Sequence, residues 1–356
     1  MSLDRAADLL KGDPGTEVRV KIRRVGVEEP IPFTLTRARV QLKAIPFAVM
    51  LDDSVGYVPL RVFRETSSQE VRAAVDSLRG EGMQGLVLDL RENPGGLLDQ
   101  GVGVADLFLE PGQVVVETRG RAPGQDERYS ASEEGSYEGL PVVVLVDELS
   151  ASASEIVAGA LQDHDRAVVV GNTSYGKGSV QTLFQLSGGN VLRLTTALWY
   201  TPVGRSIDRG HDENGRRPAI VGTLAVDGRL AALPDTAQRP PFESDGGRTL
   251  YGGGGITPDV VVLPDTLTLE EQRGVRDLYR QAGVFNLALF NYATRYIQEH
   301  PGLQPGFSVG SAMLEDFYQA LQDAGVTAER DAYRDAGRFV RYHLGREIAL
   351  QAWGEP

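Results

Sequence analysis

The sequence predicts an α/β fold on three observations. Short apolar runs with the character of buried strands alternate with amphipathic helical segments through the middle of the chain. The composition, 41% hydrophobic and 24% charged, is that of an ordinary globular protein. The 356 residues exceed the length at which one hydrophobic core usually keeps growing, so we expect two or three domains.

Residues 1–43 predict one helix and two strands, at 3–10, 17–23 and 32–40. So short a segment buries too little apolar surface to fold alone. It therefore either packs against the rest of the chain or is the end of a domain whose front part has been cut off, and we favour the second interpretation.

The alternation of strands and helices runs from residue 44 to residue 265 and forms the predicted core. In chain order, the pattern predicts strands at 55–62, 85–90, 141–146, 167–170, 179–185 and 191–200, with helices that begin at Ser67 and span 97–109 and 155–162. Residues 205–255, rich in Asp, Gly, Arg and Pro, interrupt this pattern and predict a long excursion from the core.

The pattern becomes helical in residues 266–356, which predict a helical C-terminal domain. Thr268 and Glu271 form the capping box of its first helix. Amphipathic stretches follow at 284–299, 312–324 and 329–353. Exposed aromatic residues in these stretches suit either packing or self-association, which leaves a homo-oligomer open.

Composition excludes several classes of function. The net charge of −13 and the pI near 4.9, without any basic stripe, argue against a nucleic-acid partner. The absence of cysteine excludes disulfides, thiolate nucleophiles and cysteine-based zinc sites. The longest apolar runs are too short to cross a bilayer, and the first residues do not have the pattern of a signal peptide.

One lysine is the most informative residue for chemistry. Only four of the 36 basic residues are lysine, and Lys177 is the single lysine after residue 43. Arginine serves elsewhere as the positive charge, so this position indicates a task for an amine that can give up its proton. Ser152, in the serine cluster 150–154, lies 25 residues earlier, which suggests a Ser-Lys hydrolase. The competing interpretation is a lone surface lysine between two glycines.

Ser152 follows a predicted strand and precedes a predicted helix. This position exposes a side chain and directs backbone N–H groups at it, as a nucleophile and its oxyanion require. The alternative is that Ser152 and Glu155 only form a capping box. Gln181 lies four residues after Lys177, where its amide either holds the lysine amine or is an ordinary polar group of a strand.

The paired glycines of Asn93-Pro94-Gly95-Gly96 follow another predicted strand. Glycines allow the backbone to turn its amides toward a ligand, and a tetrahedral oxyanion needs two such donors. Candidate donors are the amides of Gly95 or Gly96 and the amide of Ala153. The same four residues are also typical of a simple turn.

The histidines predict neither a catalytic triad nor a metal site. If Ser152 and His164 lie on one helix, about 18 Å separate them, which is beyond hydrogen-bond reach. His211, with Asp208, Asp212 and Glu213 nearby, matches no standard ligand spacing. The sequence therefore indicates no metal and no cofactor.

Residues 85–96, 150–155 and 176–181, in this order, closely resemble the motifs of the carboxy-terminal processing proteases, the tail-specific Ser-Lys peptidases of family S41. Residues 200–207 and 255–259 extend the resemblance. It implies a crotonase-like ββα protease core with a PDZ domain before it. Residues 1–43 then correspond to the C-terminal half of that domain. The resemblance also implies cleavage of proteins near unstructured, apolar C-termini, and an extracytoplasmic location in the periplasm or cell envelope.

Carried over residue by residue, the resemblance gives each candidate a role. The nucleophile falls on Ser152, the general base on Lys177, and the glutamine that orients the lysine on Gln181. The oxyanion donors fall on the Gly95-Gly96 turn and on Ala153. Two other functions stay open: a catalytically silent peptide-binding or scaffold protein on the same fold, and a crotonase-type enzyme acting on acyl thioesters, which would leave the serine and the lysine without a role.

Overall fold

The computed structural model describes residues 3–23, 27–40, 43–122, 124, 126–132, 137–210, 222–231, 236 and 239–354. The chain divides into two compact units. The sheet unit holds residues 43–225 and 229–266, and the helical unit holds residues 1–42, 226–228 and 267–356. The domain bounds that the sequence predicts, 1–43, 44–265 and 266–356, stay a prediction.

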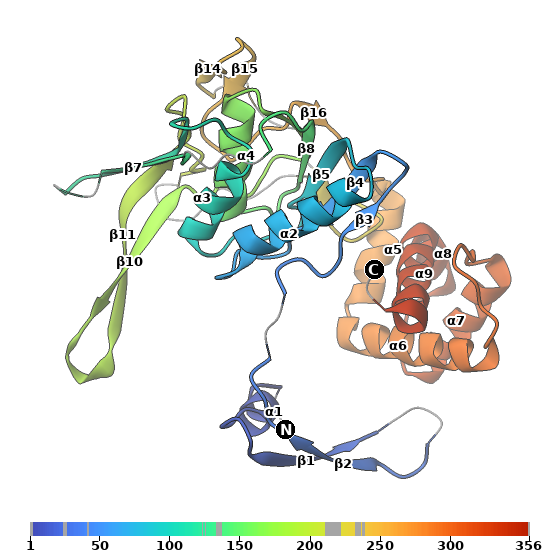
Figure 1. Cartoon of the computed structure of the whole chain (residues 1–356). Coiled ribbons are helices and arrows are strands. Elements are labelled where there is room, and N and C mark those ends of the chain that lie inside the picture. The colour runs from blue at the N-terminus through green and yellow to red at the C-terminus, as the bar shows by residue number, and fades with distance from the viewer. Residues whose placement is uncertain are drawn as a thin grey trace. The chain divides into compact units, whose positions relative to one another are not determined.

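A six-stranded sheet forms the centre of the sheet unit within the described residues (Figure 1). Its order is β16 (Val260–Val261), β9 (Ala167–Gly171), β8 (Val142–Val146), β5 (Gly85–Asp89), β4 (Val55–Pro59) and β3 (Val49–Met50). All neighbours pair in parallel except β3, which runs antiparallel to β4. The mixed α/β fold that the sequence predicts is thus confirmed.

Three helices connect the parallel strands: α2 (Ser67–Gly80), α3 (Leu98–Asp106) and α4 (Ala153–Asp163). They lie side by side, α3 between the other two, while α2 contacts β4 and α4 contacts β9. Leu88 and Val144 of the sheet and Val157 of α4 are fully buried. Burial of such side chains on both sides of the helix-sheet contact is the main source of stability here, and it fixes the carboxyl ends of the strands in place.

A second sheet has the order β10 (Ser179–Gln185), β11 (Val191–Tyr200), β6 (Val114–Gly120) and β7 (Glu127–Ser130), and all its neighbours are antiparallel. A short 3-10 turn, η1 (Ser187–Gly189), joins β10 to β11. Figure 1 shows this hairpin extending away from the six-stranded sheet. The strands at 179–185 and 191–200 that the sequence predicts are therefore present with the same bounds.

The described residues of the predicted excursion 205–255 contain two small antiparallel pairs. They are β12 (Thr223–Leu224) with β13 (Leu230–Ala231), and β14 (Pro241–Glu243) with β15 (Thr249–Tyr251). The chain rejoins the main sheet at β16. Asp212 and Glu213, like His211 beside them, lie outside the described residues.

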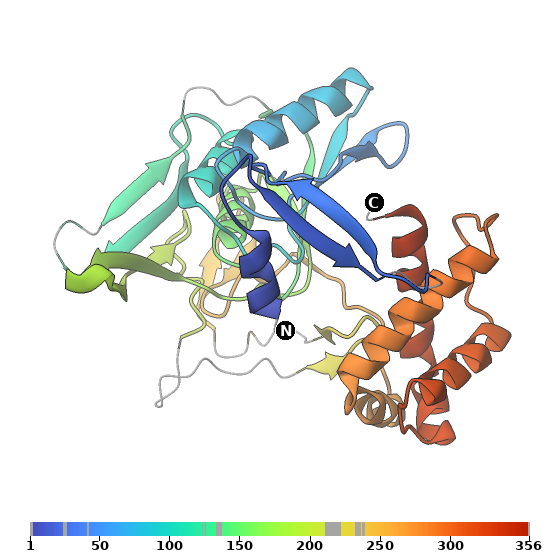
Figure 2. The ribbon, with the colours of Figure 1, turned by 90° about the horizontal axis from the view of Figure 1, so that it is seen from below.

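The helical unit begins with α1 (Leu3–Leu10) and an antiparallel hairpin of β1 (Glu17–Ile22) and β2 (Ile31–Thr36), which is visible in blue in Figure 2. That this segment belongs to a PDZ domain stays a prediction. Five helices follow: α5 (Leu269–Tyr279), α6 (Ala282–Glu299), α7 (Ser311–Asp323), α8 (Arg330–Asp335) and α9 (Gly337–Trp353). Among the helices described, none has the length and apolar character needed to span a membrane.

The sequence predicts one helix over 329–353, but the structure has two, separated at Ala336. Close packing against α5 accounts for the break. A Cβ placed on Gly274 of α5 would lie only 2.4 Å from the Ala332 carbonyl oxygen and 2.8 Å from the Ala336 nitrogen. The two backbones are thus in direct contact, and Gly337, a poor helix former, is the first residue of the next helix.

Candidate active site

The predicted site residues lie at the carboxyl ends of neighbouring parallel strands. Gly95 and Gly96 follow β5, Ser152 follows β8, and Lys177 follows β9. In open α/β sheets, ligands bind outside the carboxyl ends of the strands. The topology therefore gathers segments that are distant in the sequence at one edge of the sheet.

Ser152 occupies a sharp turn between β8 and α4. Its φ of 58° and ψ of −115° lie in a region that residues with a Cβ rarely adopt. Hydrogen bonds on both sides hold the turn: Ala151 N–H donates to the Asn93 carbonyl oxygen at 3.0 Å, and Ser152 N–H donates to Glu155 Oε2 at 2.9 Å. Strain of this kind persists where the surroundings determine the backbone, and it is concentrated at functional sites.

Glu155, in the first turn of α4, connects the serine turn to the loop that carries the lysine. Its Oε2 accepts the N–H groups of Ser152 and Lys177, both at 2.9 Å. Its Oε1 accepts the Gly176 N–H at 2.6 Å and the Ser174 hydroxyl at 2.5 Å. Because one oxygen binds both amides, the main-chain nitrogens of Ser152 and Lys177 lie within about 6 Å of each other.

The lysine loop, residues 172–178, is also held from the other side by the return segment, residues 252–256, which ends the excursion. Ser174 N–H donates to the Ile256 carbonyl oxygen at 3.0 Å, and Ile256 N–H donates to Ser174 Oγ at 2.6 Å. A Cβ on Gly255 would lie 2.5 Å from the Ser174 carbonyl oxygen, so only glycine allows this approach. The lysine loop is therefore fixed between α4 and the return segment.

The side chain of Lys177 is half-buried. Within the described residues, its amine forms no hydrogen bond and no ion pair. Its neighbour Gly178 leaves no room for a side chain, because a Cβ there would lie 2.5 Å from the Asp208 nitrogen. The backbone of the lysine is thus rigidly placed while its amine remains available.

The turn at Gly95-Gly96 lies directly against the serine. Gly95 has a φ of 93°, and a Cβ there would lie 2.7 Å from Ser152 Cβ and 2.9 Å from the Ala153 nitrogen. The Gly95 N–H donates to Asn93 Oδ1 at 2.9 Å. The amides of Gly96 and Ala153 have no acceptor among the described residues. Two main-chain donors next to the serine are thus unused.

Gln181 lies on β10 beside an irregularity in the pairing with β11. Its side chain is exposed, and Nε2 donates to Thr195 Oγ1 at 2.5 Å. No hydrogen bond joins it to Lys177 in the part of the chain that the structure describes. Its role toward the lysine stays a prediction.

Sequence reasoning missed the extent of Glu155's contacts. The capping interpretation accounts for its bond to Ser152 N–H but not for the three donors from the lysine loop. Glu155 is fully buried. Burial raises the pKa of its carboxyl group, and the donated hydrogen bonds oppose that rise. The Ser-x-x-Glu pattern in the sequence indicates only one of the four hydrogen-bond donors to Glu155, the N–H of Ser152.

The histidine nearest in sequence to the serine has a structural environment. His164 forms the C-cap of α4; its Nδ1 is 2.6 Å from Asp245 Oδ2, and its Nε2 is 2.8 Å from the Val114 carbonyl oxygen. Both ring nitrogens are therefore occupied. Over the described ranges, no three His, Asp or Glu side chains come together as a metal site would require.

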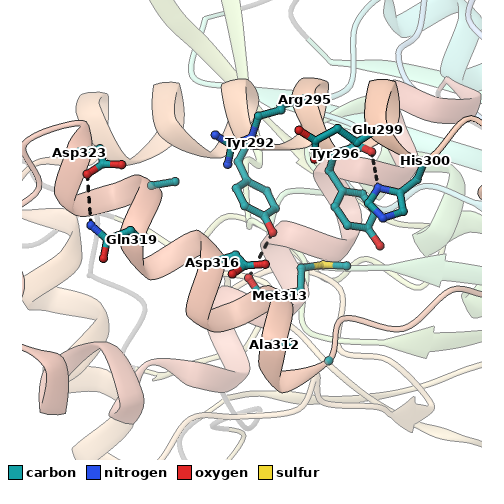
Figure 3. A pocket seen from close by; sticks show the side chains of 12 residues that line it. Tyr292, Arg295, Tyr296, Glu299, His300, Ala312, Met313, Asp316, Gln319 and Asp323 are labelled. Carbon is teal, nitrogen blue, oxygen red and sulfur yellow. Dashed lines mark hydrogen bonds between the residues drawn. The ribbon is translucent and has the colours of Figure 1, made fainter.

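The helical unit has a separate hollow of about 620 Å³ between α6 and α7. Figure 3 shows Tyr292 and Tyr296 of α6 pointing toward Asp316 and Met313 of α7. None of the predicted site residues lines this hollow. It is distinct from the site at the sheet edge.

The sequence profile of peptidase family S41 matches residues 54–214, which include Ser152 and Lys177. The chain is 43% identical to a carboxy-terminal-processing protease of Bartonella bacilliformis over 210 residues, which is 58% of this chain and 48% of that protein. It is also 43% identical to a carboxyl-terminal-processing protease of Synechocystis sp. over 214 residues, 59% of this chain and 49% of that protein.

Among solved structures, the photosystem II D1 C-terminal processing protease is similar, with 28% sequence identity, a TM-score of 0.46, and coverage of 75% of this chain and 61% of that one. The chain spans about half the length of the curated relatives it matches. The resemblance that the three motifs predict is confirmed: residues 54–214 match peptidase family S41, and the curated relatives over this region are carboxy-terminal-processing proteases.

Proposed function

We propose that the protein is a serine endopeptidase that cleaves proteins near unstructured, apolar C-termini through a Ser-Lys dyad. The match to family S41 and the printed names of the relatives support a peptidase. The observation that carries the dyad is the shared bond to Glu155 Oε2, which holds the backbones of Ser152 and Lys177 next to each other.

In the proposed reaction, the neutral amine of Lys177 accepts the proton of Ser152 Oγ as that oxygen attacks the scissile carbonyl carbon. The tetrahedral intermediate expels the amine of the leaving peptide, which takes the proton back from Lys177. Water then attacks the ester carbonyl carbon, and Lys177 accepts a proton from that water. The bond between the acyl carbon and Ser152 Oγ breaks, Lys177 returns the proton to Oγ, and the acid product leaves. No group outside the chain is needed to balance either step.

The oxyanion of this intermediate needs two donors. We propose the amides of Gly96 and Ala153, because both are unused and both lie beside Ser152. Ala153 is the first residue of α4, so the positive end of the helix dipole also favours negative charge there. The Gly95 amide is already bonded to Asn93, and we assign Gly95 the role of allowing the close approach.

The remaining assignments extend the family resemblance. Gln181 would orient the lysine amine once the hydrogen bond between its side chain and Thr195 is broken. Residues 1–43 would be the C-terminal half of a PDZ domain, residues 44–265 the protease core, and residues 266–356 a helical domain. An extracytoplasmic location follows from the same resemblance.

The test is proteolysis of a disordered polypeptide that ends in apolar residues, with fragments identified by mass spectrometry. The native chain should release fragments cut near the C-terminus, and Ser152→Ala should release none. Lys177→Arg keeps a long basic side chain, but its guanidinium stays protonated and cannot act as a base at neutral pH, so this variant should also be inactive. Turnover by the arginine variant would refute the dyad, and binding without cleavage by the native chain would favour a silent peptide-binding protein.

A further inference from the structure

Glu155 is an unusual charged group for the interior of a protein. It is 0% exposed, and within the described residues no Lys, Arg or His side chain pairs with it. Its four partners, three amides and one hydroxyl, are donors. A carboxylate can accept all four of these hydrogen bonds at once.

We infer that Glu155 is a positioning residue that sets the distance between the Ser152 hydroxyl and the Lys177 amine; the inference rests on the proposed function. The carboxylate touches neither the substrate nor the reacting atoms in the proposed steps. It acts through the main chain, because its Oε2 holds the N–H of the nucleophile and the N–H of the base at the same distance, 2.9 Å.

Oε1 extends this connection to the return segment. Ser174 donates its hydroxyl hydrogen to Oε1 at 2.5 Å and accepts the Ile256 N–H at 2.6 Å. The hydrogen bonds therefore run in one direction, from Ile256 through Ser174 to Glu155. A displacement of the return segment would be transmitted to the carboxylate, and from it to both members of the dyad.

Only a glutamate has the chemistry for this position. Glutamine keeps the length but replaces one acceptor oxygen with an NH₂ group, which would face either two amide donors or an amide and a hydroxyl donor. Aspartate keeps both acceptors but is shorter by one methylene and cannot reach the lysine loop from the same helical position. Among these three residue types, only glutamate can accept all four hydrogen bonds from this position.

A second glutamate offers a matched control. Glu271 occupies the equivalent capping-box position of α5 in the helical unit, where it accepts the Thr268 N–H at 2.7 Å and also pairs with Arg338 Nη1 at 3.1 Å, an exposed contact that should contribute little to stability. Glu271→Gln makes the same chemical change at a helix start that has no part in the proposed site. A decrease in kcat that both variants share reports on helix capping. A decrease in kcat that only Glu155→Gln shows reports on the geometry of the dyad.

The experiment measures kcat and KM on a fluorescence-quenched disordered peptide with an apolar C-terminus, together with amide hydrogen exchange of residues 172–178. For Glu155→Gln we expect kcat to fall by about 100-fold with KM changed by less than about 3-fold, since a displacement near 1 Å has this cost. Exchange in the lysine loop should rise. Glu271→Gln should match the native chain in both measurements.

Glu155→Gln with kcat within about 3-fold of native would overturn the inference. If that variant does not fold, Ser174→Ala provides the test, because it removes one hydrogen-bond donor to Glu155 and leaves the carboxylate in place. For this variant kcat should fall by about 10-fold at constant KM. An unchanged kcat would overturn the inference. If the native chain shows no turnover, the proposed function fails. Unchanged exchange of residues 172–178 in Glu155→Gln would then separately refute the positioning role.

Discussion

Asp163 and Arg205 form an ion pair that is completely removed from solvent. Both side chains are 0% exposed, and Arg205 Nη2 lies 2.6 Å from Asp163 Oδ1. The guanidinium also donates to Gln162 Oε1 at 2.6 Å, and Val203 N–H donates to Asp163 Oδ2 at 3.1 Å. The pair therefore connects the end of α4, the helix that Ser152 caps, to the start of the 205–255 excursion.

Asp163→Ala should destabilise the sheet unit by about 3 to 5 kcal/mol, because it leaves the Arg205 charge buried without a partner. Urea unfolding measures this change. The matched control is Glu315→Gln, which breaks an ion pair with Arg330 whose side chains are 58% and 57% exposed; it should cost less than about 1 kcal/mol. Equal effects of the two substitutions would contradict the buried-pair account.

Gly95→Ala should abolish turnover. The added Cβ would lie 2.5 Å from the Ala151 carbonyl oxygen and 2.7 Å from Ser152 Cβ, so the serine turn has to move. Gly95 also has a φ of 93°, which penalises any side chain. Gly112→Ala is the control, since its φ of 84° carries the same penalty but nothing lies within 4 Å of the new Cβ. Loss of turnover in both variants would point to backbone strain alone.

Asn93→Asp should lower stability and turnover together. The buried amide of Asn93 donates to the Leu60 carbonyl oxygen at 2.7 Å and accepts the Gly95 N–H at 2.9 Å. A carboxylate keeps the second bond but turns the first into repulsion between two oxygens, at a cost of about 1 to 3 kcal/mol. Thermal unfolding and peptide turnover check both effects, and an unchanged melting temperature would show that the bond to Leu60 contributes nothing.

The helical unit should lose stability in mild acid because of His343. Burial lowers the pKa of His343 from 6.5 to about 4; the charge of Arg346 adds to the decrease, and that of Asp227 opposes it. Among the described residues, its Nε2 has no hydrogen-bond partner. Between pH 6.5 and pH 4 the unfolded chain therefore binds more protons than the folded chain, and stability falls as the pH is lowered.

Urea unfolding across this pH range tests the prediction, with His343→Phe as the comparison. The variant removes the titrating group and should flatten the dependence between pH 6.5 and pH 4. A native profile that is already flat in this range, or a variant with the native slope, would exclude His343 as the source.

Local pattern was sufficient to predict most elements. The helix at Leu3–Leu10 and the strands at Ser179–Gln185 and Val191–Tyr200 have the predicted bounds, because apolar spacing and turn residues act within a few positions of each other. The break at Ala336 could not be predicted, since it depends on contact with Gly274, about sixty residues earlier.

For the candidate site, too, the sequence indicated local features but not contacts between distant segments. Ser152 and Lys177 could be singled out in the sequence because their residue types and surroundings are uncommon for purely structural positions, and their catalytic roles stay proposals. The contacts of Glu155 with the lysine loop, and of Ser174 with Ile256, were not recognisable, since they join segments that only the sheet topology brings together. The bond from the Gly95 amide to Asn93 Oδ1, which is the reason for proposing Gly96 and Ala153 as the oxyanion donors, was likewise not recognisable in the sequence.

The return segment has a consequence for biosynthesis. It leaves the ribosome some eighty residues after the lysine loop that it braces through Ile256 and Gly255. A nascent chain therefore contains Ser152 and Lys177 before the segment that braces the lysine loop has been synthesised. Under the proposed function, the chain would gain its hydrolytic activity only after residue 256 has emerged, and a shorter nascent chain would be poorly able to cleave itself or its neighbours.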